Sequence, residues 1–97
     1  MIPINYTEFK YALEQNTPEI NWPEGLKALW YVAKDDWQNS HAIAQDLHTP
    51  LGSWIHGYLH RKEGDAFNAG YWYKQAGKTY PTINLEDELQ EIVESIL

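Results

Sequence analysis

Hydrophobic positions recur with helical spacing along most of the chain, and the strict alternation of a half-buried strand is nowhere sustained. The clearest stripe lies in residues 84–97, where most of the other positions are acidic or polar. Its apolar members are Leu85, Leu89, Ile92, Val93 and Ile96. The pattern therefore predicts an all-α fold that includes an amphipathic helix with its acidic side in solvent.

Capping residues and prolines divide the chain into about six helices. Thr7, Asp65 and Asn84 are typical N-cap residues, and either Asp35 or Asp36 can cap the third helix. The predicted helices are residues 7–15, 24–34, 36–47, 51–63, 65–76 and 84–97. At 97 residues the chain is long enough for one modest core, so we expect a single helical domain over residues 1–97.

The sequence contains an internal repeat. Residues 34–42 are echoed 29 residues later by residues 63–71, and Gly64 in the second copy is placed to end a helix in the left-handed conformation. A recurrence at this spacing favours stacked helical hairpins, because each hairpin has an apolar face that only a neighbour can cover. We therefore expect two tandem hairpins, with an N-terminal and a C-terminal helix covering their open sides.

Two resemblances follow from these segments. Residues 26–47 and 55–76 each combine a helix, a tight turn and a second helix with an early small residue and a central aromatic residue. This arrangement is similar to the tetratricopeptide repeat, especially its Sel1-like branch, which implies a concave binding face lined by the first helix of each pair. The string LHRKEGDAFNAGYWY at residues 59–73 also resembles the signature of a family of small helical proteins of unknown function. That second resemblance implies no activity and no catalytic residues.

Composition narrows the possible functions. The net charge is −7, and the seven basic residues are scattered, whereas a phosphate backbone requires clustered Lys and Arg, so we expect no nucleic-acid partner. Cysteine is absent, which excludes disulfides and thiolate chemistry. We see neither a leader peptide nor a membrane span, and we expect a cytoplasmic protein with no membrane contact.

Histidines give the first candidate site. On a helix, His56, His60 and Glu63 share a narrow sector, and His41 from the preceding helix can join them. Imidazoles one turn apart can hold a divalent metal such as zinc. The zinc-protease pattern is absent, because Gly57 stands where that mechanism needs a glutamate. The alternative, which we favour at this point, is a pair of histidines at the edge of the core that bond to Glu63 or to a carbonyl.

The turn between the fourth and fifth helices gives a second candidate. Arg61, Glu63, Asp65 and Asn68 gather there, either as an anion clamp formed by Arg61 with His60 or as a polar lock that sets the angle between two helices. The polar lock is the preferred interpretation.

The fifth helix and the serines complete the candidates. Trp72 and its neighbouring tyrosines favour core packing, with an aromatic ligand platform as the alternative. None of the serines stands in a Gly-x-Ser-x-Gly setting, so we expect no serine triad.

The sequence therefore supports three functional hypotheses. The leading one is a non-catalytic binding or scaffold module for a protein, a peptide or a small polar ligand, without a cofactor and able to form a homodimer. Its groove would comprise Lys27, Tyr31, Lys34, His56, His60 and Glu63. The second is a metal-dependent enzyme or metal-binding protein centred on His56 and His60. The third is docking of the acidic helix 84–97 into a groove of a larger partner.

Overall fold

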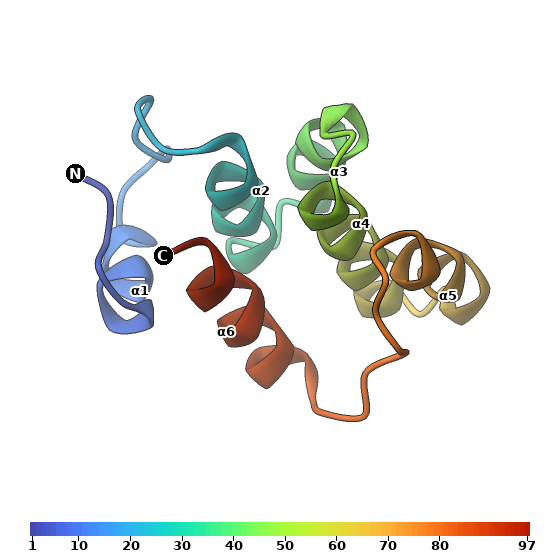
Figure 1. The fold of residues 1–97 in the computed structure, drawn as a ribbon. Helices are drawn as coiled ribbons and strands as arrows, with labels where there is room; N and C mark the ends of the chain where they lie inside the picture. Colours follow the sequence, from blue (N-terminus) through green and yellow to red (C-terminus); the bar gives the residue numbers. More distant parts are fainter.

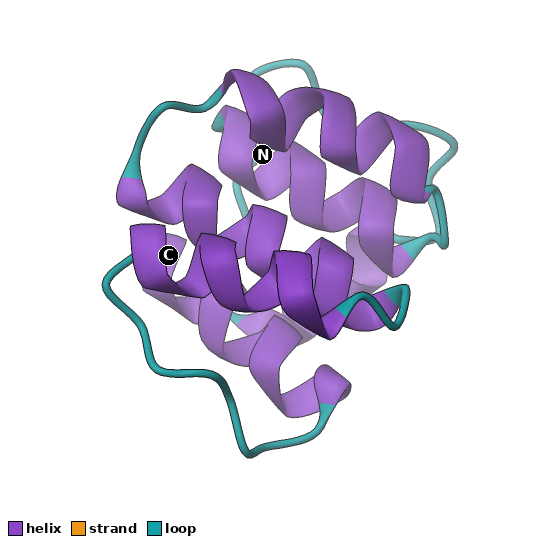
Figure 2. Cartoon of the chain, turned by 90° about the vertical axis from the view of Figure 1, so that its right-hand side faces the viewer, coloured by secondary structure: helices purple, strands orange, loops and turns teal.

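The computed structural model describes all 97 residues and contains six α-helices and no strand (Figures 1 and 2). The helices are α1 (Tyr6–Ala12), α2 (Glu24–Ala33), α3 (Trp37–Asp46), α4 (Pro50–Lys62), α5 (Ala66–Gln75) and α6 (Leu85–Ile96). The all-α class and the number of helices are thus confirmed. None of these helices combines the length and the apolarity needed to cross a lipid bilayer.

The helices pack mainly against their neighbours along the chain. The closest pairs are α2 with α3 and α4 with α5, and α3 packs on α4 to join the two pairs. In Figure 1, α1 and α5 lie at opposite ends of the molecule, and α6 runs back between them. Helix α6 contacts α4, α2 and α1, so it covers the side that the two pairs leave open.

The two turns that carry the repeat have nearly the same geometry. Asp36 caps α3 by accepting from the backbone N–H of Asn39 at 3.2 Å, and Asp65 caps α5 by accepting from that of Asn68 at 3.2 Å. In each turn the asparagine side chain donates back to the same aspartate, at 2.7 Å and 2.6 Å. The predicted caps of both helices are confirmed, with Asp36 rather than Asp35 as the cap of α3.

The residue before each of these caps is left-handed. Gly64 has φ +88°, as predicted for a residue that ends a helix, and Asp35 occupies the same place with φ +62°. Glycine adopts this conformation without strain, whereas an aspartate does so at a steric cost. The second turn is therefore the more relaxed of the two.

Two helix starts differ from the sequence prediction. Helix α1 is capped by Asn5, whose side chain accepts from the N–H of Glu8 at 2.9 Å, and Thr7 lies inside the helix. Helix α4 begins at Pro50, after Thr49 accepts from the N–H of Gly52 at 3.0 Å. In both cases a suitable cap one or two residues earlier captures the free amide groups of the first turn.

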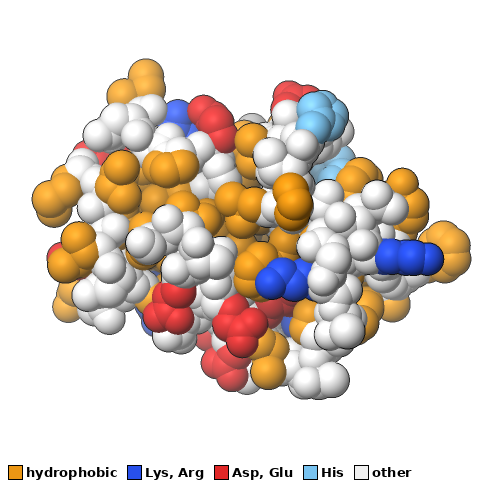
Figure 3. All heavy atoms as spheres, viewed as in Figure 1, with side chains coloured by type: hydrophobic (Ala, Val, Ile, Leu, Met, Phe, Trp, Pro, Cys, Tyr) orange, Lys and Arg blue, Asp and Glu red, His pale blue; other side chains and the backbone are white.

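The core lies where α2, α4 and α6 meet. Its fully buried members include Leu26, Leu29, Ile55, Leu59, Ile92 and Val93. The apolar stripe of α6 faces this core, and Figure 3 shows acidic side chains gathered over the outer side of the same helix. One acid departs from the expected division, because Glu88 lies on the buried side and is only 1 % exposed.

Candidate metal centre

Three histidines converge between α3 and α4. His41 lies on α3, and His56 and His60 lie one turn apart on α4. One ring nitrogen from each lies within 4.8 Å of the other two. The ring centres of His41 and His56 are 4.6 Å apart, and those of His56 and His60 are 5.0 Å apart. The structure thus brings together the three residues that the sequence offered as metal ligands.

Helix spacing and packing explain this convergence. Residues four apart on a helix project from the same face, which places His60 above His56 on α4. Packing of α3 on α4 then adds His41 from the other side. His56 is 6 % exposed, the His60 side chain is 13 % exposed, and His41 is half-buried. The cluster therefore lies at the edge of the fold, shielded from water but reachable.

Two tryptophans stack on the cluster. The indole of Trp37, one turn before His41 on α3, lies parallel to the His41 ring, with centres 4.7 Å apart and an angle of 11°. The indole of Trp72 on α5 lies parallel to the His56 ring, with centres 3.9 Å apart and an angle of 9°. Trp72 is thus drawn into the site by direct contact with a candidate ligand.

The third histidine is held by a carboxylate. Nδ1 of His60 lies 2.7 Å from Oε2 of Glu63, which matches the predicted bond between a histidine at the core edge and Glu63. An ionised carboxylate only accepts, so in the neutral ring Nδ1 carries the proton and Nε2 keeps a free lone pair. The hydrogen bond of His60 to Glu63 is therefore compatible with metal binding by the other nitrogen of the same ring.

Burial keeps two of the rings uncharged near neutral pH. Loss of water contact, followed by the nearby charges of His41 and His60, lowers the pKa of His56 to about 4. Burial also lowers the pKa of His41, with a further contribution from His60 and an opposing one from Glu63. Neutral imidazole is the form that binds a metal, so at these two residues protons compete little with a metal at pH 7.

The spacing is close to what a metal requires. Zinc binds imidazole nitrogen at about 2.0–2.1 Å, which in a tetrahedron places two nitrogens about 3.3 Å apart. The three nitrogens lie within 4.8 Å of one another, so each pair must approach by up to about 1.5 Å to reach that spacing. No Asp, Glu or Cys completes this group, so the fourth position of a tetrahedral ion is left for water or another ligand.

Asp65, Asn68 and Glu63 lie beside this cluster. His60, Glu63 and Asp65 form a second group of potential ligands within 4.8 Å. Asp65 is already engaged as the cap of α5, and its pKa is lowered first by the side-chain hydrogen bond from Asn68. The closeness of these three residues thus follows largely from the structure of the turn between α4 and α5.

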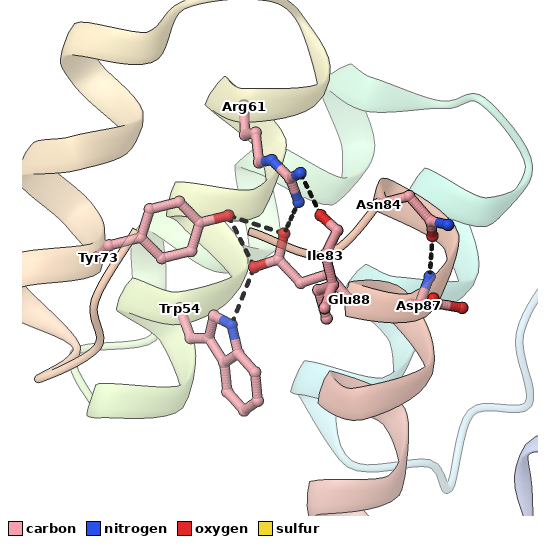
Figure 4. Close-up of polar contacts among 7 residues, drawn as sticks. All are labelled: Trp54, Arg61, Tyr73, Ile83, Asn84, Asp87 and Glu88. Carbon is pink, nitrogen blue, oxygen red and sulfur yellow. Dashed lines mark hydrogen bonds and ion pairs between the residues drawn. The ribbon is translucent and has the colours of Figure 1, made fainter. Parts of the chain in front are cut away.

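Arg61 is engaged with α6 and with the segment that precedes it. Its guanidinium donates to Oε1 of Glu88 at 2.7 Å and also to the carbonyl of Ile83 (Figure 4). The clamp of Arg61 with His60, considered from the sequence, is therefore absent from this geometry.

Glu88 completes a buried polar network that joins α4, α5 and α6. Its carboxylate accepts from the hydroxyl of Tyr73 at 2.7 Å and from the indole N–H of Trp54 at 3.2 Å, in addition to Arg61 (Figure 4). Burial and the bond to Glu88 raise the pKa of Tyr73. The sequence predicted a polar lock of Arg61, Glu63, Asp65 and Asn68 at the turn between α4 and α5. Of these residues only Arg61 belongs to the present network, and its acceptor Glu88 was missed. The available signal was an acid one turn from Leu85 and from Ile92 on the apolar side of α6.

The remaining candidates bond elsewhere. Lys34 donates to the carbonyl of Leu13 at 2.7 Å, and Lys27 pairs with Glu24 at 3.3 Å. Ser40 is buried and donates its hydroxyl to a backbone carbonyl at 2.6 Å, as expected for a serine without a triad. These side chains are occupied by ordinary hydrogen bonds, so the three histidines are the strongest candidates for a functional site.

Comparison with known proteins gave no match to a family model, to a curated protein or to a solved structure. The similarities to tetratricopeptide hairpins and to the small helical family stay predictions.

Proposed function

We propose that the chain is a small metal-binding domain in which His41, His56 and His60 hold a divalent transition-metal ion, with zinc as the first candidate. The observation that supports this proposal is the approach of one nitrogen from each ring to within 4.8 Å of the others. The three rings come from two helices that belong to different hairpins, so the convergence depends on the tertiary fold.

The donor set favours particular metals. Three imidazoles suit zinc, copper, nickel and iron, whereas calcium and magnesium require oxygen ligands that this triad lacks. Three protein ligands and one open position are typical of zinc sites that exchange a ligand, and structural zinc sites usually have four protein ligands. We propose metal binding at this site and no reaction.

Binding has a mechanical consequence for the fold. His41 belongs to the α2–α3 pair, and His56 and His60 belong to the α4–α5 pair, so a bound ion would join the two pairs. A ligand that binds only the folded state stabilises it by about 2.7 kcal/mol when present at 100 times its dissociation constant. The metal-loaded protein should accordingly unfold at a higher temperature.

The test begins with protein stripped of metal by a chelator. Calorimetric titration with zinc should give one equivalent bound, and replacing any one of the three histidines by alanine should weaken binding at least tenfold. His48→Ala is the matched control, since His48 is the one other histidine and is exposed between α3 and α4. Circular dichroism establishes that each variant is folded. Absence of binding by the wild type, or an equal loss in His48→Ala, would contradict the proposal.

A second candidate function, binding of a protein partner or of a second copy, is favoured by the outer side of α5. Phe67 and Tyr71 lie one turn apart there and are 87 % and 55 % exposed. Two adjacent exposed rings form a contiguous apolar surface, and aromatic residues are enriched at protein–protein interfaces. Sedimentation of the wild type and of a Phe67→Ser, Tyr71→Ser variant tests self-association, and a monomer in both would remove the second copy as the partner.

A further inference from the structure

We infer that Trp37, Trp72 and Glu63 are positioning residues of the metal site, each restricting the orientation of one ligand histidine. This inference rests on the proposed function. The partners are Trp37 for His41, Trp72 for His56 and Glu63 for His60. Each of the three candidate ligands therefore has a partner of its own.

The geometry of the stacks suits a metal ligand. A metal–imidazole bond lies in the plane of the ring, along the lone pair of a nitrogen. A partner that covers the ring face, as Trp72 covers His56 at 3.9 Å, therefore fixes the ring without blocking its nitrogens. A partner that instead bonded to the nitrogens of His56 would compete with the metal.

Trp37 is itself anchored to the opposite helix. Its indole N–H donates to the carbonyl of Leu59 on α4 at 2.8 Å. Since Trp37 also stacks on His41, this hydrogen bond sets the position of the His41 ring relative to α4, which carries the other two ligands. The anchor explains why a ligand from α3 reaches a site built on α4.

Glu63 acts through the other nitrogen of its histidine. Its carboxylate, 2.7 Å from Nδ1 of His60, keeps the proton there, which leaves Nε2 for the ion. Loss of such outer partners typically lowers metal affinity about 10-fold to 100-fold. Glu63 is 39 % exposed, so its substitution disturbs little packing.

The experiment compares conservative and disruptive substitutions. Trp72→Phe keeps a flat ring on His56, whereas Trp72→Leu removes it, and Glu63→Gln keeps an acceptor for His60, whereas Glu63→Ala removes it. Zinc affinity should fall about tenfold or more in the two disruptive variants and remain closer to wild type in the conservative ones. Phe67→Leu and Glu94→Ala are controls, because both residues are exposed and lie outside the site.

Two spectroscopic readouts separate positioning from packing. In metal-free protein, nitrogen NMR should show one tautomer of His60, protonated at Nδ1, and Glu63→Ala should convert it to a mixture. With cobalt in place of zinc, the visible bands of the tetrahedral ion should change in Trp72→Leu and persist in Trp72→Phe. A mixed His60 tautomer in the wild type, or wild-type affinity in both disruptive variants, would overturn the inference while zinc binding by the wild type stood. A wild type that binds no zinc would overturn the proposed function itself.

Discussion

Acid should destabilise the metal-free protein through His56. The ring is 6 % exposed and is packed against Trp72, with His41 and His60 beside it. Burial is the main reason that its pKa is lowered from 6.5 to about 4, and the charges of the two neighbouring histidines add to it. In the unfolded chain the ring regains water and its ordinary pKa, so the unfolded state takes up a proton first as the pH falls.

The size of the effect follows from the two pKa values. The interval from 6.5 to about 4 corresponds to about 3 kcal/mol of unfolding free energy, since each pKa unit is worth about 1.4 kcal/mol. This stabilisation is fully present above pH 6.5, declines as the pH falls through that value, and is lost once the folded protein is also protonated, near pH 4. The window lies mostly above the range in which exposed carboxylates titrate.

Urea unfolding between pH 7.5 and pH 4.5 in the presence of a chelator measures this effect. His56→Phe keeps a flat ring against Trp72 and removes the titrating group, so the stability advantage of the wild type over this variant should shrink by about 2.5 kcal/mol between pH 7.5 and pH 4.5. Replacing the exposed His48 by Phe should leave the pH dependence unchanged. Parallel curves for the wild type and His56→Phe, or a His56 ring signal that titrates near pH 6.5, would refute the reasoning.

Two further predictions concern packing. Replacing Glu88 by Ala removes the acceptor of one buried and two partly buried donors and should lower the unfolding free energy by about 3–5 kcal/mol, whereas the exposed Glu91→Ala should change it little in the same urea titration. A Cβ at Gly57 would lie 3.2 Å from the ring of Tyr73, so Gly57→Ala should cost about 1–3 kcal/mol. At Gly70 a Cβ meets nothing within 4 Å, and Gly70→Ala should raise the thermal midpoint by adding helix propensity worth up to about 1 kcal/mol. The opposite ranking of the two glycine variants would contradict this account of the α4–α5 contact.

Local signals predicted the helices well. The caps at Asp65 and Asn84 are confirmed, as is the left-handed Gly64, because each depends on a hydrogen bond or a torsion angle within a few residues. Thr7 was wrong as a cap because Asn5 offers the same side-chain acceptor earlier in the chain. Whether Asn5 or Thr7 caps α1 depends on how the helix packs on its neighbours, and the local sequence does not contain that information.

The site was predictable only in part, for the same reason. The spacing of His56 and His60 places both on one face of any helix, whereas the approach of His41 depends on how α3 packs on α4. The stacking of Trp72 on His56 depends on how α5 is rotated about its axis. In the sequence Glu88 looks like the exposed acids of α6, because a carboxylate is buried only where partners such as Arg61 compensate its charge, and those partners lie on other helices. Tertiary contacts, rather than residue types, therefore completed both clusters.

Helix α1 is attached to the bundle less firmly than α4, and α6 supplies part of its attachment. The hydroxyl of Tyr6 donates to Glu86 across 80 residues of chain, and this bond lies at the surface. Helix α1 contributes a single buried side chain, Phe9, whereas α4 contributes six buried residues, so α1 opens at a lower cost in free energy. Amide hydrogen exchange should therefore be fastest in α1 and slowest in α4, and a bound ion between α3 and α4 should slow exchange there without protecting α1.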